Sequence, residues 1–191
     1  CEYAKGTGFE NHAFFEAPSI RKRGDTYYLV YSSSAMHELC YAASKDPLWG
    51  FQYGGVIVSN CDLHIDSYKS KDKIMAYGGN NHGSIVEING NWYIFYHRHT
   101  NGTWYSRQGC VEPIAFLPDG SIPQAEITSS GPNGGPLRGE GEYPAHIACH
   151  LYLQDGMELY TGTPGQPRIM QAGSDWAPGD SYIGDIKDGT T

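Results

Sequence analysis

The sequence contains no long apolar run and few charged residues. None of its segments reaches the 18 or more consecutive apolar residues expected of a membrane-spanning helix. Lys, Arg, Asp and Glu together make up 18% of the 191 residues, whereas an average soluble domain has about 25%. Much of the polar surface must therefore come from uncharged residues, and Gly (25 residues) and Tyr (15 residues) are abundant.

Positive charge is especially scarce. The chain has 13 Lys and Arg against 21 Asp and Glu, a net charge of −8, and its densest basic run is only residues 21–23. Nucleic acids and anionic membrane surfaces attract clustered Lys and Arg. We therefore expect neither of them as a partner, and an uncharged substrate fits this composition better.

Five cysteines are too few for a disulfide scaffold, and they lack the CxxC spacing of a zinc site. They are Cys1, Cys40, Cys61, Cys110 and Cys149. We predict that most are buried small hydrophobic residues. The chain begins with Cys1 rather than Met, which indicates processing or a fragment and leaves lipid attachment at Cys1, as in bacterial lipoproteins, as an alternative.

A repeat is present in the sequence. Residues 19–31 align without a gap with residues 84–96, at an offset of 65 positions. Each copy predicts a strand, a tight turn and a second strand, because Gly24-Asp25 and Asn89-Gly90 suit the positive φ angles of hairpin turns.

Two more strands are expected after each hairpin. Residues 39–43 and 53–58 follow the first copy, and residues 108–116 and 121–127 follow the second. Four antiparallel strands per repeat predict the blades of a β-propeller, with a β-sandwich as the alternative. Two blades cannot close a ring, so either further blades precede the chain or copies of it cover the open blade faces as a homo-oligomer.

The composition changes beyond the second repeat. Residues 129–142 are rich in Gly, Pro and Ser and predict a linker or wrapping loop. Residues 145–153 and 158–160 again have strand-like patterns, and residues 161–191 are rich in Gly, Pro and Asp.

Glu16 is the first candidate for chemistry, because it follows Phe14 and Phe15 at the start of an innermost strand, where propellers present side chains to the central channel. A carboxyl desolvated by aromatic rings has a raised pKa and can act as a general acid near neutral pH. The alternative is a solvated glutamate. In the second repeat Asn81 aligns with Glu16 and His82 with Ala17, so polar side chains of both blades are expected to converge.

Four segments together resemble glycoside hydrolase family 43. They are residues 6–34, 36–42, 79–96 and 107–114. Members of this family are five-bladed β-propellers, many of them α-L-arabinofuranosidases and β-xylosidases. The resemblance implies an all-β chain made of the last two blades of such a propeller (residues 1–135), followed by a linker and the start of a β-sandwich of carbohydrate-binding type (residues 136–191), which residues 182–190 resemble.

The resemblance also implies roles for single residues. Glu16 occupies the position of the general acid, and His82 that of a histidine near a calcium ion or water cluster on the propeller axis. Arg107 resembles an arginine that reaches sugar hydroxyls, with a pair to surface acids such as Glu112 as the alternative. The pocket wall is expected to include Phe14, Phe15 and Trp104, unless these are core residues.

One departure from the family pattern concerns the catalytic base. Family 43 enzymes invert configuration with an acid and a base on opposite faces of the sugar, and the base Asp and an Asp that tunes the acid lie upstream of the matched segments. Other carboxylates that can stand in for the base are Glu38, Asp62, Asp66 and Glu112.

Two hypotheses follow for function. In the first, the chain belongs to a secreted or periplasmic bacterial hydrolase that removes α-L-arabinofuranosyl or β-D-xylosyl residues from arabinoxylan, arabinan or xylooligosaccharides, with no required cofactor and calcium only in a structural role. In the second, the chain is a non-catalytic, self-associating fragment that at most binds sugar.

Overall fold

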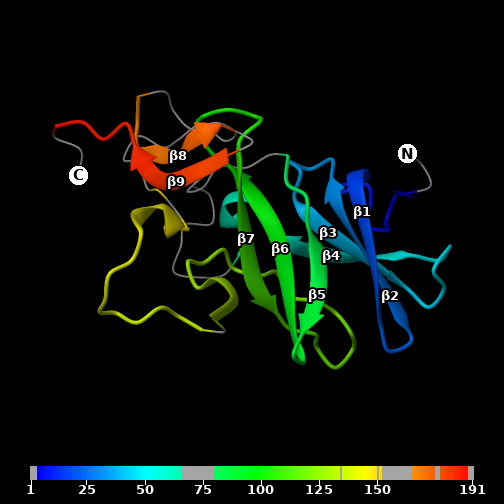
Figure 1. The fold of residues 1–191 in the computed structure, drawn as a ribbon. Coiled ribbons are helices and arrows are strands. Elements are labelled where there is room, and N and C mark those ends of the chain that lie inside the picture. Colours follow the sequence, from blue (N-terminus) through cyan, green and yellow to red (C-terminus); the bar gives the residue numbers. More distant parts are fainter. Residues whose placement is uncertain are drawn as a thin grey trace.

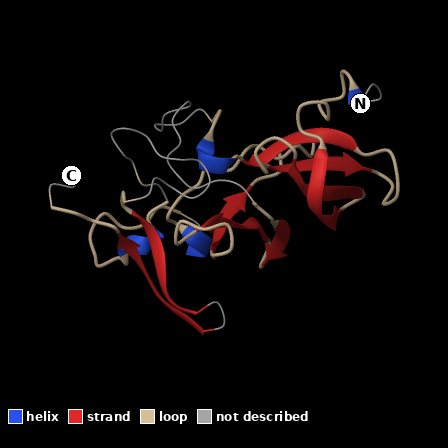
Figure 2. Cartoon of the chain, turned by 90° about the horizontal axis from the view of Figure 1, so that it is seen from above, coloured by secondary structure: helices blue, strands red, loops and turns tan. Residues whose placement is uncertain are grey.

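The computed structural model describes residues 4–65, 80–133, 135–149, 151, 165–174 and 177–188. Within these ranges the chain is nearly all β, with short 3₁₀ turns at Asn60–Asp62, Gly131–Asn133 and Ala145–Ile147. Figures 1 and 2 show two antiparallel sheets and a separate hairpin. No helix among the described residues is long and apolar enough to cross a membrane.

The first sheet has the four strands expected of a blade. Its strands are β1 (Phe14–Arg23), β2 (Thr26–Ser33), β3 (Leu39–Ser44) and β4 (Gln52–Val58), and they pair in that order. The β1–β2 turn passes through Gly24 at a φ of 57°, a left-handed conformation that glycine adopts without steric cost. Each strand is antiparallel to the next.

The second sheet has three strands among the described residues. They are β5 (Ser84–Ile88), β6 (Asn91–His99) and β7 (Arg107–Ile114). The prediction of a fourth strand at residues 121–127 is wrong, because this segment forms no hydrogen-bonded ladder with β7. Its backbone N–H groups are used elsewhere: Ile122 donates to the Tyr41 hydroxyl (2.9 Å), and Ala125 donates to the Ile57 carbonyl (2.7 Å). Pro123 has no N–H to offer to a ladder.

The C-terminal part contains a hairpin of β8 (Arg168–Ser174) and β9 (Ala177–Gly184). The strand expected at residues 145–153 is wrong over its described part, which begins with a 3₁₀ turn. The Arg98 guanidinium binds the carbonyls of His146, Ala148 and Cys149, so a side chain takes acceptors that a ladder would have used. Residues 158–160 lie outside the described residues. The β-sandwich stays a prediction.

The main core fills the space between the two sheets. Among its buried residues are Val30, Leu39 and Tyr41 from the first sheet and Ile85 and Ile94 from the second. Burying these apolar faces against each other removes them from water, which holds the two repeats side by side.

A smaller core lies on the opposite face of the first sheet and includes buried Tyr31 and Cys40. The residues before β1 cover it. The Phe9 ring centroid lies 6.4 Å from that of Tyr31 and 5.7 Å from that of Tyr53, and the Tyr31 hydroxyl donates to the His12 carbonyl (2.8 Å). This face, which we expected to be open, is thus partly covered by the chain itself.

The cysteine prediction is confirmed for Cys40, which is a buried free thiol. Cys110 and Cys149 are also free and partly buried. Burial raises the pKa of Cys40 to about 12 and that of Cys110 to about 11, so both remain protonated and unreactive at neutral pH. Cys1 and the Cys61 side chain lie outside what the structure describes.

Candidate active site

The site begins at an irregularity in β1. The pairing of β1 with β2 shifts register on both sides of Glu16, and the next residue, Ala17, has a φ of 56°. A left-handed alanine is strained, and such strain persists only where the surrounding structure enforces it. The bulge sets the direction of the Glu16 side chain independently of the regular alternation of β1.

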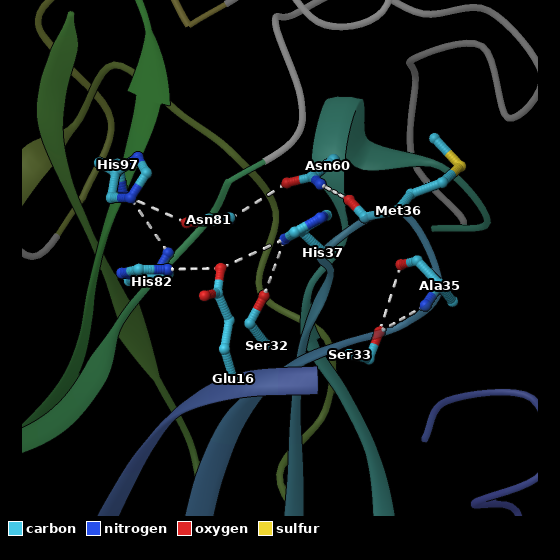
Figure 3. Close-up of polar contacts among 10 residues, drawn as sticks. All are labelled: Glu16, Ser32, Ser33, Ala35, Met36, His37, Asn60, Asn81, His82 and His97. Carbon is cyan, nitrogen blue, oxygen red and sulfur yellow. Dashed lines mark hydrogen bonds and ion pairs between the residues drawn. The ribbon is translucent and has the colours of Figure 1, made fainter. Parts of the chain in front are cut away.

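Glu16 lies between two histidines (Figure 3). Its Oε1 is 2.9 Å from His82 Nε2 and 3.6 Å from His37 Nδ1, and its side chain is 41% exposed. His82 precedes β5, so the contact joins the two repeats. The convergence predicted from the alignment of the repeats is therefore confirmed.

His37 is a site residue that the sequence reasoning did not single out. It sits in the β2–β3 turn, where Met36 and His37 both have left-handed φ angles of 53° and 56°. Its Nδ1 is 3.5 Å from the Ser32 hydroxyl, and its ring contacts the Phe15 ring edge-on at 4.8 Å between centroids. The only sequence signal was its place in one of the four family-like segments.

A chain of hydrogen bonds holds His82 from behind. The backbone N–H of His82 donates to His97 Nε2 (3.2 Å), and the backbone N–H of His97 donates to Asn81 Oδ1 (3.3 Å). Asn81 Nδ2 in turn donates to Asn60 Oδ1 (3.1 Å). Asn60 in turn donates to the Met36 carbonyl (Figure 3). Burial lowers the pKa of His97 to about 4, so its imidazole is neutral and free to accept at Nε2.

The electrostatics of Glu16 differ from the sequence prediction. The hydrogen bond from His82 lowers the pKa of Glu16 below its ordinary value, and the charges of His82, His37 and Arg107 act in the same direction. We expected desolvation to raise the pKa of Glu16, and this prediction is wrong among the described residues. The Phe14 and Phe15 rings are themselves about half exposed and so remove little water from the carboxyl. This arrangement favours an ionised carboxylate.

Arg107 begins β7 opposite His99, and its side chain is exposed. Its Nη1 donates to the Tyr105 carbonyl (3.2 Å). The alternative of a surface pair with Glu112 is wrong, because Glu112 is buried and accepts hydrogen bonds from Thr128. Arg107 is instead close enough to Glu16 to influence its pKa.

The aromatic candidates are not core residues. Phe14 is 52%, Phe15 54% and Trp104 43% exposed. Phe14 packs on Tyr31, with 5.9 Å between ring centroids, and Trp104 meets the His99 ring edge-on at 5.5 Å. Exposed aromatic faces beside a polar centre are typical of ligand-binding walls.

The described carboxylates that we considered as substitute bases have structural partners. Glu38 accepts from the Ser59 hydroxyl (2.6 Å) and lies 3.5 Å from His12 Nε2. Asp62 accepts from the Ile127 N–H (2.8 Å), and Glu112 holds the same segment through Thr128. Asp66 lies outside the described residues.

The described residues around His82 do not by themselves form a calcium site. Calcium takes about six to eight oxygen ligands, whereas the described neighbours of the His82 side chain are the Glu16 carboxylate and the His97 ring. Within the described ranges no group of three or more His, Cys, Asp or Glu residues is arranged to hold a metal ion.

Comparison with known proteins gives a consistent result. The family model "Glycosyl hydrolases family 43" matches residues 3–122. A xylosidase/arabinosidase of Thermoclostridium stercorarium is 63% identical over 195 aligned residues, covering 99% of this chain and 41% of that protein. A beta-xylosidase of Xylanibacter ruminicola is 34% identical, covering 58% of this chain and 31% of its own length.

Among solved structures, a family 43 beta-xylosidase/alpha-arabinofuranosidase from a compost microbial metagenome, in complex with xylotriose and in a calcium-free form, is 34% identical with a TM-score of 0.47. The match covers 58% of this chain and 30% of that one. The chain thus spans less than half the length of the relatives it matches.

Proposed function

The chain belongs to glycosyl hydrolases family 43, and we propose that it supplies the general acid of a hydrolase that removes α-L-arabinofuranosyl or β-D-xylosyl residues from plant hemicellulose. The observation that carries this proposal is the 2.9 Å contact between Glu16 and His82, which joins the two repeats at one polar centre. The names of the relatives, xylosidase/arabinosidase and beta-xylosidase, support the substrate class.

In the proposed inverting reaction Glu16 protonates the glycosidic oxygen while a base on the opposite face of the sugar removes a proton from the attacking water. The two carboxyl groups of such enzymes lie about 6.5–9.5 Å apart, which leaves room for the water. We assign the base to an aspartate of a preceding part of the polypeptide, since the described candidates Glu38, Asp62 and Glu112 are buried in structural contacts.

A general acid must carry a proton when the substrate binds. The lowered pKa of Glu16 therefore calls for an opposing influence. A second carboxylate nearby provides it, because like charges disfavour ionisation and raise the pKa. We assign this role to the tuning aspartate that the family resemblance implies upstream, so that His82 orients Glu16 while the aspartate keeps it protonated.

The substrate side of the site is proposed to consist of Arg107, which binds sugar hydroxyls, and the exposed rings of Phe14, Phe15 and Trp104, which form the pocket wall. The net charge of −8 suits neutral sugars. Calcium, if bound beside His82, needs oxygen ligands from outside the described residues.

The test is the hydrolysis of xylotriose and the release of 4-nitrophenol from the α-L-arabinofuranoside and the β-D-xyloside. We expect Glu16→Gln to lower kcat on xylotriose about 10²- to 10⁴-fold, the usual contribution of general acid catalysis, and to lower it less on the 4-nitrophenyl glycosides, because 4-nitrophenolate leaves with little help from a proton. Glu87→Gln, at an exposed position of β5, serves as the control. Activity that is unaffected by Glu16→Gln overturns the assignment.

A second candidate function is a non-catalytic sugar-binding fragment, which the exposed aromatic residues and the partial coverage of the relatives favour. It requires that residues 1–191 bind oligosaccharide but hydrolyse neither glycoside.

We further propose that isolated chains associate through open blade faces and that the protein is secreted or periplasmic. A monomer at micromolar concentration in light scattering contradicts the association.

A further inference from the structure

The loop between β6 and β7, residues 100–106, is tightly bonded within itself. The Thr100 N–H donates to the Ser106 carbonyl (3.0 Å), and Asn101 Nδ2 donates to the Ser106 hydroxyl (3.2 Å). The Thr103 hydroxyl accepts from the N–H groups of Tyr105 and Ser106 at 3.1 and 3.2 Å. These bonds join the two ends of the loop and tie Thr103 to its last residues.

The C-terminal hairpin clamps this loop from outside, and Figure 1 shows β8 beside it. The Asn101 N–H donates to the Ile169 carbonyl (2.8 Å), and Asn101 Oδ1 accepts from the Gln171 N–H (2.5 Å). The Thr100 hydroxyl donates to Gln171 Oε1 (2.8 Å). Asn101 thus binds β8 with its backbone N–H and its side-chain oxygen, at a left-handed φ of 57°.

The clamped loop presents two aromatic side chains. Trp104 is 43% and Tyr105 is 83% exposed. The loop follows β6 at the strand end that carries His97, whose ring accepts from the His82 N–H. Arg107 donates a hydrogen bond to the Tyr105 carbonyl, and its charge helps to lower the pKa of Glu16. β6 runs antiparallel to β5, so the loop that follows β6 lies beside His82, the residue two positions before β5, and carries the two rings at the rim of the Glu16–His82 site.

We propose that β8 holds this loop so that Trp104 and Tyr105 form a platform for the sugar unit on the leaving-group side of Glu16. This inference rests on the proposed function. A general acid protonates the oxygen of the leaving group, so the next sugar of the chain lies beside the acid and outside the pocket of the first sugar. The C–H faces of sugar rings are apolar and pack on aromatic faces. The hairpin thereby makes the site selective for oligosaccharides over single sugars.

The experiment measures the binding of xylotriose and of xylose by calorimetry, with the chain in its natural polypeptide and Glu16→Gln present to prevent turnover. We expect Tyr105→Ala and Trp104→Ala to weaken xylotriose binding about 3- to 10-fold, the size of an aromatic contact. Tyr105→Ala should leave xylose binding within about twofold, whereas Trp104→Ala also removes part of the pocket wall. Tyr105→Phe keeps the ring and retains affinity. Tyr143→Ala, at another exposed tyrosine, is the control.

The clamp is tested with a matched pair at Asn101. Glycine accepts a φ of 57° without strain, so Asn101→Gly removes the side-chain clamp alone, whereas Asn101→Asp keeps the acceptor for the Gln171 N–H. We expect Asn101→Gly to weaken xylotriose binding about as much as Tyr105→Ala, and Asn101→Asp to stay near the parent protein. Unchanged xylotriose binding in the Tyr105→Ala and Trp104→Ala variants overturns the platform, and unchanged binding in Asn101→Gly overturns the clamp.

These outcomes are separable from failure of the proposed function. If Glu16 governs hydrolysis of xylotriose but the aromatic variants bind xylotriose like the parent, the platform is wrong and the function stands. If Tyr105→Ala weakens xylotriose binding but Glu16→Gln does not affect hydrolysis in the otherwise unchanged protein, the platform stands and the acid assignment fails.

Discussion

The hydroxyl of Ser19 donates a hydrogen bond to the hydroxyl of Ser84 over 2.9 Å, and the two serines hold the same position in the two copies of the repeat. Ser19 lies in β1 and Ser84 begins β5, so the bond joins the first strands of both sheets. Glu16 and His82 lie three and two residues before these serines. The symmetric pair thus fixes the distance between the strands that carry the acid and its histidine.

We predict that Ser19 and Ser84 are energetically coupled. Ser19→Ala and Ser84→Ala each remove the same hydrogen bond, so the double variant loses less stability than the sum of the single ones. The coupling should be about 0.5–1.5 kcal/mol, the net value of one hydrogen bond. Urea unfolding of the four proteins measures it, and strictly additive losses contradict the prediction.

His82 is predicted to orient Glu16. His82→Asn shortens the side chain and breaks its contact with Glu16 Oε1, so the carboxyl loses its fixed position. A displacement of about 1 Å from the reacting bond costs about 100-fold in rate. We expect kcat on xylotriose, whose sugar leaving group needs a proton, to fall about 10- to 100-fold.

The control for this variant is His64→Asn, at an exposed residue with a left-handed φ of 63° that asparagine tolerates. A similar loss in both variants would mean that the effect is general destabilisation rather than lost orientation. Full activity of His82→Asn would remove His82 from the proposed machinery.

Glu112 is predicted to make stability depend on pH. Burial raises the pKa of Glu112 above its ordinary value, although hydrogen bonds from Thr128 and Tyr96 oppose the rise. The folded chain therefore binds this proton more tightly than the unfolded chain does, and the free energy of unfolding falls as pH rises from 4.5 through the raised pKa.

Glu112→Gln cannot ionise and keeps the shape of the side chain. Its free energy of unfolding should fall less than that of the parent protein between about pH 4.5 and about pH 7. Urea unfolding at both pH values checks this, with the exposed Glu87→Gln as control. Parallel pH profiles of parent and Glu112→Gln would show that the raised pKa does not affect folding.

Phe9 is predicted to protect the outer face of the first sheet, where it packs on Tyr31 and Tyr53. Phe9→Ala uncovers this apolar face, so we expect a loss of about 1–3 kcal/mol in the free energy of unfolding, less than for a fully buried ring, together with stronger self-association. Unfolding and light scattering measure the two effects. Leu48→Ala, at a residue that is 81% exposed, should change neither.

Local features explain what could be predicted. The turn residues Gly24-Asp25 and Asn89-Gly90 predicted the first two strands of each sheet, because a hairpin turn acts through neighbours in sequence. The alignment of the repeats likewise predicted that Glu16 and His82 converge. Their contact is a direct consequence of two similar sheets lying side by side.

Other expectations failed because distant partners decide them. Residues 121–127 have a strand-like pattern, but their N–H groups bind Tyr41, Ile57 and Asp62. His37 has no local signal for a catalytic neighbourhood, since only the left-handed β2–β3 turn brings it to Glu16.

The sequence by itself determined the repeat, the antiparallel character and the two polar residues that meet, since strand pairing and hairpin turns follow from short-range residue patterns. Only the tertiary structure lowered the pKa of Glu16, because the hydrogen bond from His82, helped by the charges of His82, His37 and Arg107, outweighs desolvation once folding brings these groups together. It also decided that β8 holds the loop of Trp104 and Tyr105, since that contact joins residues about 70 positions apart in the chain.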